Sequence, residues 1–352
     1  MKLKAALLHS TAAAALALTF ISTARADIQL VVVDSGLDAV LLVDPTSGDR
    51  TVLSSSGVGS GTNFLLPRGI AQEANGDFVV CDADLDAIVR VDGTTGDRTI
   101  MSSAVGPVGS GDGFVTLFDI AVEDDGSIIV ADTGLLALIR VDPSTGDRTV
   151  LSSSSVGTGS AFINPSDIGV ESDGNIIVTD GSGADTVVRV DPSNGNRSLL
   201  SGTGPAFGNL SGVSFEADDS IIVSDTTTDS IYRVNPSSGD RTVISSNSNS
   251  GPAFGTILAI TTESDGNLIV AETTGANALN RVDVSTGDHS VVSGTGTGSG
   301  TDFIELHDVI EISDPVEPVP TLPVWGLALL SCLLLAAGGQ TLWYRRPIMI
   351  EH

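Results

Sequence analysis

Apolar and polar positions alternate along this chain in short runs that are separated by turn residues. In the stretch 119–153 the runs are bounded by Asp125-Gly126 and by a Pro-Ser-Thr-Gly-Asp loop. Short alternating runs are typical of β-strands, and Asp-Gly between two of them is a strong hairpin signal, because both central residues favour positive φ. The pattern predicts four strands in this unit, at 119–123, 127–132, 138–142 and 148–152.

The unit is repeated along the chain. The phrase VDPSTGDRTVLSS at 141–153 recurs with small changes, and its glycine marks each copy. These glycines are Gly48, Gly96, Gly146, Gly195, Gly239 and Gly287, with spacings of 44 to 50 residues. A period of this length with short β segments is typical of propeller blades. The sequence therefore predicts an all-β fold of six four-stranded blades, in which each phrase closes an outer hairpin.

The two ends of the repeat region complete each other. The segment 28–36 resembles the second strand of a unit, whereas 308–312 resembles the first strand. We expect this last strand to complete the first blade, which closes the ring and removes open sheet edges.

Each loop between blades holds one phenylalanine. The six are Phe64, Phe114, Phe162, Phe207, Phe254 and Phe303. Because they recur in every copy, we expect them to fill the seams between blades; stacking on a ligand is the alternative.

The repeat resembles the NHL family of propellers. The matching stretches in one unit are 119–122, Asp125-Gly126, 129–132 and 138–141, and the resemblance extends over the globular region 27–313. It implies the propeller fold. Members of that family serve as binding platforms, lyases and lactonase-like hydrolases, so the resemblance leaves the function open.

The N-terminal segment 1–26 has a basic start, an apolar stretch and the ending Ala24-Arg25-Ala26. This order predicts a secretory signal peptide that passes through the Sec pathway and is removed by signal peptidase, leaving Asp27 as the first residue.

The C-terminal segment consists of a Pro-rich linker at 314–322 and a tail at 323–352. The tail has an apolar run long enough to span a bilayer, followed by Arg345-Arg346 on the cytoplasmic side. The order of parts resembles the C-terminal sorting tails of Gram-negative bacteria whose motif reads Ile-Pro-Thr-Leu-Ser. The matching residues are Val319, Pro320, Thr321, Leu322, Trp325 and Gly326, with Pro323 in place of the serine. The resemblance implies transient anchoring, processing by an exosortase-like enzyme and delivery to the cell surface or extracellular matrix. A plain membrane anchor is the alternative.

Charge and missing motifs exclude several functions. The formal net charge is −28, and the only lysines are Lys2 and Lys4. Such a surface repels nucleic acid and favours cations or a high-salt environment, unless it serves solubility alone. A propeller without lysine excludes Schiff-base chemistry, and the chain has no G-x-S-x-G, no H-E-x-x-H and no phosphate-binding loop.

Candidate ligand residues lie where the blades differ. The acids that end the second strands recur in every blade, so we expect them to bind backbone amides; they are Asp34, Asp82, Asp132, Asp180, Asp225 and Glu272. The starts of the first strands differ, and they surround the mouth of the central channel. The ligand-binding candidates there are Arg68, Phe118, Asp119, Asp167, His307 and Asp308. Asp119, Asp167 and Asp308 are the predicted ligands of a hard cation such as Ca²⁺, and polar groups that hold channel water are the alternative.

Two functional hypotheses follow. The first is a non-enzymatic scaffold that binds an extracellular protein, a glycan or a cation. The second is a metal-dependent hydrolase or lyase, lactonase-like or streptogramin-lyase-like, with Asp119, Asp167, His307 and Asp308 at its centre. His289 replaces the arginine of the repeated phrase and is expected away from this site.

Overall fold

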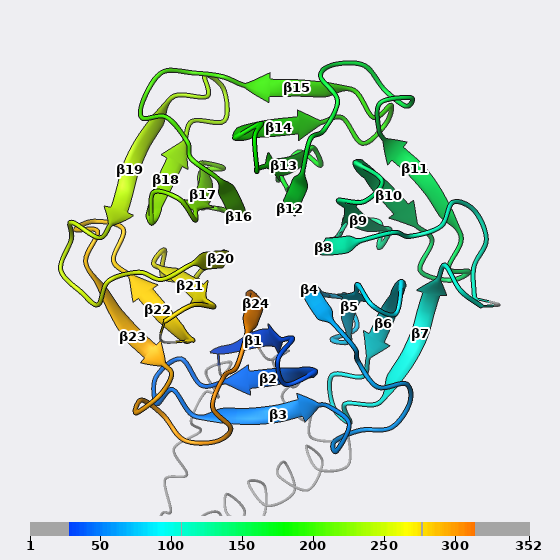
Figure 1. Cartoon of the computed structure of the whole chain (residues 1–352), viewed down its shortest axis with the longest axis horizontal. Coiled ribbons are helices and arrows are strands. Elements are labelled where there is room, and N and C mark those ends of the chain that lie inside the picture. The colour runs from blue at the N-terminus through cyan, green and yellow to red at the C-terminus, as the bar shows by residue number, and fades with distance from the viewer. Residues whose placement is uncertain (1–27, 107, 276, 314–352) are drawn as a thin grey trace, which may run out of the picture. The chain divides into compact units, whose positions relative to one another are not determined.

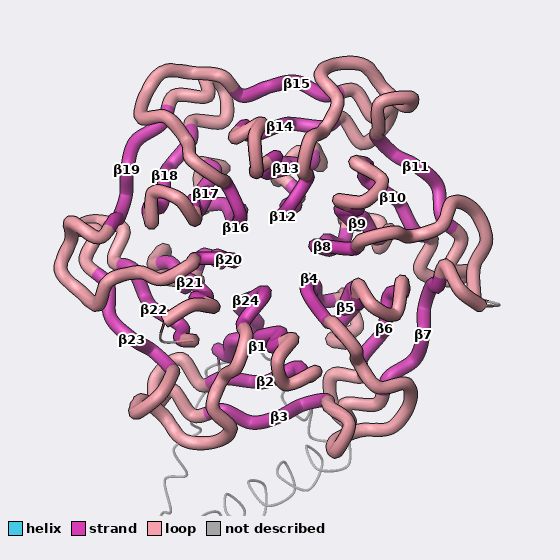
Figure 2. Tube along the Cα trace, viewed as in Figure 1, coloured by secondary structure: helices cyan, strands magenta, loops and turns pink. Residues whose placement is uncertain are grey.

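The computed structural model describes residues 28–106, 108–275 and 277–313, whose regular secondary structure consists entirely of β-strands. Six antiparallel four-stranded sheets surround a central axis (Figures 1 and 2). The six-bladed β-propeller predicted from the repeat is therefore confirmed. The predicted signal peptide and sorting tail lie outside the described residues. Within the described part, no helix is long and apolar enough to cross a membrane.

Each blade runs from an inner strand at the axis to an outer strand at the rim. The first blade consists of β24 (Leu306–Ser313), β1 (Ile28–Asp34), β2 (Ala39–Val43) and β3 (Arg50–Ser54). The second consists of β4 (Pro67–Gln72), β5 (Phe78–Asp82), β6 (Ala87–Val91) and β7 (Arg98–Ser103). The third consists of β8 (Leu117–Val122), β9 (Ile128–Asp132), β10 (Ala137–Val141) and β11 (Arg148–Ser152).

The remaining three blades follow the same order. The fourth consists of β12 (Pro165–Val170), β13 (Ile176–Asp180), β14 (Thr186–Val190) and β15 (Arg197–Leu200). The fifth consists of β16 (Leu210–Phe215), β17 (Ile221–Asp225), β18 (Ser230–Val234) and β19 (Arg241–Ser246). The sixth consists of β20 (Ile257–Thr262), β21 (Leu268–Glu272), β22 (Ala278–Val282) and β23 (His289–Ser293).

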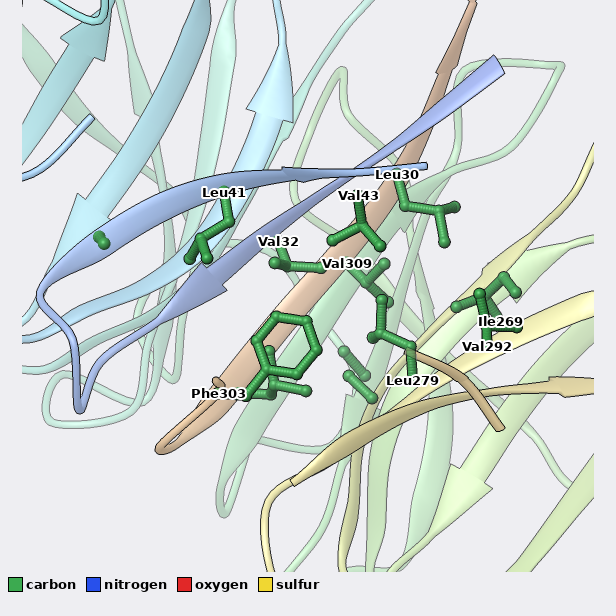
Figure 3. Packing of buried hydrophobic residues seen from close by; sticks show 13 residues of the cluster. Leu30, Val32, Leu41, Val43, Ile269, Leu279, Val292, Phe303 and Val309 are labelled. Carbon is green, nitrogen blue, oxygen red and sulfur yellow. The ribbon is translucent and has the colours of Figure 1, made fainter. Parts of the chain in front are cut away.

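The hydrophobic core lies between blades. The second strands are runs of β-branched residues without alternation, because neighbouring blades cover both of their faces. In the cluster between the sixth and first blades, side chains from both sheets interdigitate (Figure 3). Its labelled members are Leu30, Val32, Leu41, Val43, Ile269, Leu279, Val292, Phe303 and Val309.

The first blade is closed by the C-terminal strand, as the sequence predicted. β24 pairs antiparallel with β1, and Ile28 lies opposite Ser313. The other five blades carry a Glu–Arg pair between the end of the inner strand and the third strand, as in Glu73 and Arg90. At the same two places the first blade has Ile312 and Leu42. Both charges are replaced together, which avoids an unpaired partly buried charge.

The repeated phrase joins neighbouring blades at the rim. Arg98 donates through Nη1 to Ser54 Oγ of the preceding blade at 2.6 Å, and its Cζ lies 5.5 Å from the ring centroid of Phe64. At the one seam where histidine replaces arginine, His289 stacks on Phe254 with centroids 3.9 Å apart. The phenylalanines therefore fill the seams, as expected from their recurrence.

Candidate functional site

The acids at the ends of the second strands have the structural role that the sequence predicted. Asp132 is fully buried and accepts backbone N–H groups from Val115, Thr116, Gly134 and Leu135 at 2.8 to 3.1 Å. The carboxylate of Asp132 thus links the turn after β9 to the segment that leads into the inner strand β8.

The end of the channel where these turns lie is called the mouth, and the chain approaches every inner strand from this end.

A register shift interrupts each inner strand at the mouth. In β8, Leu117 pairs with Asp132 and Asp119 with Ala131, which leaves Phe118 without a partner. The same shift leaves His307 unpaired in β24 and Arg68 unpaired in β4. A β-bulge turns a side chain away from its regular direction, and bulges are frequent beside functional sites. The fold therefore places the three largest candidate side chains at the mouth, on three consecutive blades.

Arg68 differs from the other arginines in the described part of the chain. Its Cζ lies 5.0 Å from the ring centroid of Phe118. Its Nε is buried and has no hydrogen-bond partner among the described residues; the Nε of Arg241 is in the same state, but Arg241 still donates through Nη2 to the carbonyl oxygen of Gly202 at 3.2 Å. Every other described arginine donates at least one hydrogen bond, to a paired glutamate or across a blade seam. Unsatisfied guanidinium donors are costly unless an acceptor reaches them.

His307 lies beside Arg68 and is neutral at physiological pH. Burial of the ring and the nearby charge of Arg68 lower its pKa to about 4. The side chain is 11% exposed, and its Nε2 lies 3.8 Å from Glu305 Oε1. A neutral imidazole at this place can donate one hydrogen bond and accept another.

Asp119, Asp167 and Asp308 lie deeper, at the step of the inner strand below the bulge. In each, Oδ2 accepts a backbone N–H from the inner strand of the next blade. The pairs are Asp308 with Ile70 at 2.8 Å, Asp119 with Ile168 at 2.9 Å and Asp167 with Val213 at 2.9 Å. The second oxygens of Asp167 and Asp308 accept the N–H of the residue that follows them. These carboxylates join three pairs of neighbouring blades.

Burial raises the pKa of all three carboxyl groups. For Asp119 the pKa lies well above its usual value because of burial and the adjacent charge of Asp167. Burial raises the pKa of Asp167 to about 7, although a hydrogen bond from Asp119 acts in the opposite direction. Burial and the charge of Asp119 raise the pKa of Asp308 to about 8. The raised pKa favours the protonated form of Asp119, whose carboxyl group hydrogen-bonds to Asp167.

These three groups line a cavity of about 380 Å³ in the channel, which is otherwise formed largely by apolar residues of the inner strands. Within 28–106, 108–275 and 277–313, no group of three or more His, Cys, Asp or Glu side chains has an arrangement that could hold a metal ion. The predicted calcium ligands are brought together, but backbone amides occupy the oxygens that a cation requires. The geometry therefore fits blade-to-blade contacts better than a metal centre.

A second feature of the mouth was not predicted from the sequence. Four exposed aliphatic residues directly follow a seam phenylalanine, and each precedes the inner strand of one of the first four blades. Two more exposed aliphatic residues lie in the turn after β9. These six residues, which we call the mouth patch, are Ile304, Leu65, Val115, Ile163, Leu135 and Leu136, with exposures between 37% and 54%. In the fifth and sixth blades the place after the phenylalanine is Gly208 or Gly255. The signal was present in the sequence as an apolar residue after Phe in four copies.

Leu136 is held in an unfavourable backbone conformation. Its φ is +52°, in the left-handed region, where a leucine gains nothing from a local side-chain hydrogen bond. The other five blades place Asp or Asn at the equivalent turn position, namely Asp38, Asp86, Asp185, Asp229 and Asn277. An exposed leucine at this position is an exception to the repeat, and exceptions of this kind gather at functional sites.

Comparison with known proteins supports the fold. No protein-family model and no curated protein sequence matches the chain. Among solved structures, it is similar to a chain of a nidogen–laminin complex, with a TM-score of 0.62 and 16% identity over 81% of this chain and 98% of that one. A gluconolactonase from Xanthomonas campestris matches with a TM-score of 0.53 and 16% identity over 81% and 95%. A streptogramin B lyase matches with a TM-score of 0.52 and 14% identity over 82% and 88%. At these identities the likeness concerns the propeller fold alone.

Proposed function

We propose that this chain is an exported propeller, delivered to the cell surface through its sorting tail, that binds an extracellular protein at the mouth as a non-enzymatic scaffold. The mouth patch is the observation that carries this proposal. Repeated charges and aromatic rings are engaged inside the fold, whereas six aliphatic side chains stay exposed on one face. Grouped exposed apolar residues mark interaction surfaces, and an aliphatic surface favours a polypeptide over a polar glycan.

The ends of the described propeller also support this use of the mouth. Ile28 and Ser313 pair at the end of the first blade where the other blades have their Asx-Gly or Asp-Asp turn. His307, Arg68 and Phe118 lie at the opposite ends of their strands. The described propeller thus begins and ends at the side opposite the mouth.

Site-specific crosslinking in the full-length protein on living cells tests this proposal. A photo-reactive residue at Leu65 or Ile304 should give a discrete protein adduct. The same residue at Leu199, which is 45% exposed on the outer strand β15, is the matched control and should give none. Equal adducts from the mouth and from the rim would contradict a binding role for the mouth.

The alternative function is a metal-dependent hydrolase or lyase in the channel. The channel cavity, and separately the neutral His307 at the mouth, favour it, but the carboxylates of Asp119, Asp167 and Asp308 accept backbone N–H groups and do not fit a metal. Metal analysis of the purified full-length protein, followed by a lactone and glycan screen with and without millimolar calcium, decides between the two. Calcium-dependent turnover would favour the enzyme, whereas a calcium-dependent rise in melting temperature that is lost when the three aspartates become Asn would show a cation site without deciding whether the protein is an enzyme.

A further inference from the structure

The unsatisfied guanidinium of Arg68 indicates the chemistry of the ligand. The ring of Phe118 lies against one face of this planar group, so a ligand can reach the N–H donors only in the plane of the guanidinium. Planar bidentate acceptors match this arrangement, and a carboxylate is the most common of them. Arg68 forms no ion pair with any described residue, and this is also true of Arg98, Arg148, Arg197 and Arg241. Those four donate hydrogen bonds to oxygens at the blade seams, whereas Arg68 donates none to a described residue. Its guanidinium therefore has donors available for an acceptor that arrives from outside.

The surroundings of Arg68 specify what carries the carboxylate. Leu65 precedes Arg68 by three residues on the same approach segment, and Val115 precedes Phe118 by three. Ile304 stands in the same relation to His307. Each of these aliphatic residues is slightly more than half exposed. Three consecutive blades thus pair one exposed aliphatic residue with one large side chain at the mouth.

Leu135 and Leu136 extend the same surface on the third blade. A Cβ placed on Gly134 would lie only 2.5 Å from Val115 Cγ1, so the turn of the two leucines packs directly against Val115. The exposed apolar area of Val115 therefore continues onto the turn that carries Leu135 and Leu136. Leu136 keeps its left-handed conformation although the equivalent position elsewhere accepts Asp or Asn. A leucine at this position strains the backbone and exposes an apolar side chain to water. Both costs are explained if the side chain of Leu136 contacts a binding partner.

We propose that the mouth binds a carboxylate carried on an apolar segment of a partner polypeptide, with Arg68 as the anchor and the mouth patch as the apolar contact. Neutral His307 supplies one additional hydrogen bond to the carboxylate. This inference rests on the proposed binding role of the mouth. The net charge of −28 repels anions at long range, so we expect selection for an apolar ligand with one carboxylate rather than for a polyanion.

The test uses the full-length protein and the tripeptide acetyl-Ile-Leu-Phe, with either a free C-terminal carboxylate or an amide, in a titration followed by calorimetry. We expect the free acid to bind at least about tenfold tighter than the amide, the size of one charge-assisted bidentate interaction. Arg68→Gln should abolish this difference, and Arg68→Lys should recover only part of it.

Two further variants separate the apolar contribution. Leu136→Asn inserts the residue type that the other blades tolerate at this φ, so the fold is preserved, and Leu65→Ser removes a half-exposed side chain. Both variants should lower the affinity for the free acid and for the amide by the same factor, whereas Leu199→Ser on the rim should change neither affinity. Acetate that binds as tightly as the tripeptide would overturn the polypeptide ligand, and equal affinities for acid and amide would overturn the role of Arg68.

The outcomes distinguish this inference from the proposed function. Crosslinking at Leu65 that persists in Arg68→Gln, together with equal affinities for acid and amide, would overturn the inference of a carboxylate ligand but would leave the proposed scaffold function intact. Absence of crosslinking at the mouth, with carboxylate binding intact, would leave a small-acid site and remove the protein partner.

Discussion

The replacement of a Glu–Arg pair by Ile312 and Leu42 in the first blade permits a direct test of how the ring closes. In the second blade, Arg90 Nε lies 2.5 Å from Glu73 Oε2 and Arg90 Nη2 lies 2.6 Å from Glu73 Oε1. If β24 occupies the inner position of the first blade in the same register, Ile312→Glu and Leu42→Arg together should rebuild this pair.

The expected changes in the free energy of unfolding follow from how deeply each side chain is buried. Ile312 is 8% exposed, so Ile312→Glu places a carboxylate without a partner in an apolar seam and should lower the free energy of unfolding by about 3–5 kcal/mol. Leu42→Arg should cost about 1 kcal/mol, because the long side chain can extend toward water as Arg90 does at 33% exposure. The double variant should recover about 2 kcal/mol relative to the sum, the usual value of hydrogen bonds to charged groups.

Urea denaturation of the wild type, the two single variants and the double variant measures this coupling. With an unfolding entropy of roughly 2 cal/mol/K per residue, recovery of about 2 kcal/mol corresponds to about 3 °C in melting temperature. The reverse cycle, Glu73→Ile with Arg90→Leu, is the matched control and should show coupling of similar size. Additive effects in the first blade with coupling in the second would refute the register of β24.

Three other predictions concern the termini and the channel. Between about pH 4 and about pH 8 the free energy of unfolding should fall, because burial raises the pKa of Asp167 from 3.8 to about 7 and that of Asp308 from 3.8 to about 8. The folded state keeps protons in this window that the unfolded chain has already released, so the stability present below the unfolded pKa is lost as pH rises through the folded one. Urea midpoints that stay level in this window, or fall equally in a variant with Asn at both positions, would contradict this cause. Deleting 306–313 should cause aggregation or a marked loss of thermal stability, since it opens two sheet edges, and an unchanged melting temperature would refute closure. Surface-exposed protein should lack the segment from about Trp325 onward, and mass spectrometry that finds the C-terminal residues on the surface would leave a simple anchor.

Much of the fold was predictable because each copy of the repeat carries the same turn residues and the same apolar strand segments. Asp-Gly turns, the phrase around Gly146 and the mid-unit start of the chain predicted six blades and the closing strand. The Glu–Arg pair was a further signal for closure, because it is missing only where two distant segments have to form one blade. Comparing position 312 with position 42 was possible only after the register of β24 was known.

The site was predictable in place but not in chemistry. Differences between blades directed attention to Arg68, Phe118 and His307, and the structure places all three at bulges around the mouth. The sequence could not show that the oxygens of Asp119 and its partners accept N–H groups from the next blade. That contact depends on the distance between inner strands, which the twist of each blade sets and no local pattern encodes.

The residues that depart from the repeat are unevenly distributed around the mouth, and this affects where a ligand can bind. Residues present in every blade are engaged in its seams and turns, so they cannot distinguish one sector of the ring from another. The exceptions at the mouth lie on the first four blades, where Arg68, Phe118 and the mouth patch are found, whereas the fifth and sixth blades have Gly208 and Gly255 at the patch positions. A ligand bound by these residues therefore lies off the channel axis. Six equivalent blades provide a rigid frame, and departures from their symmetry on one side determine where a partner binds.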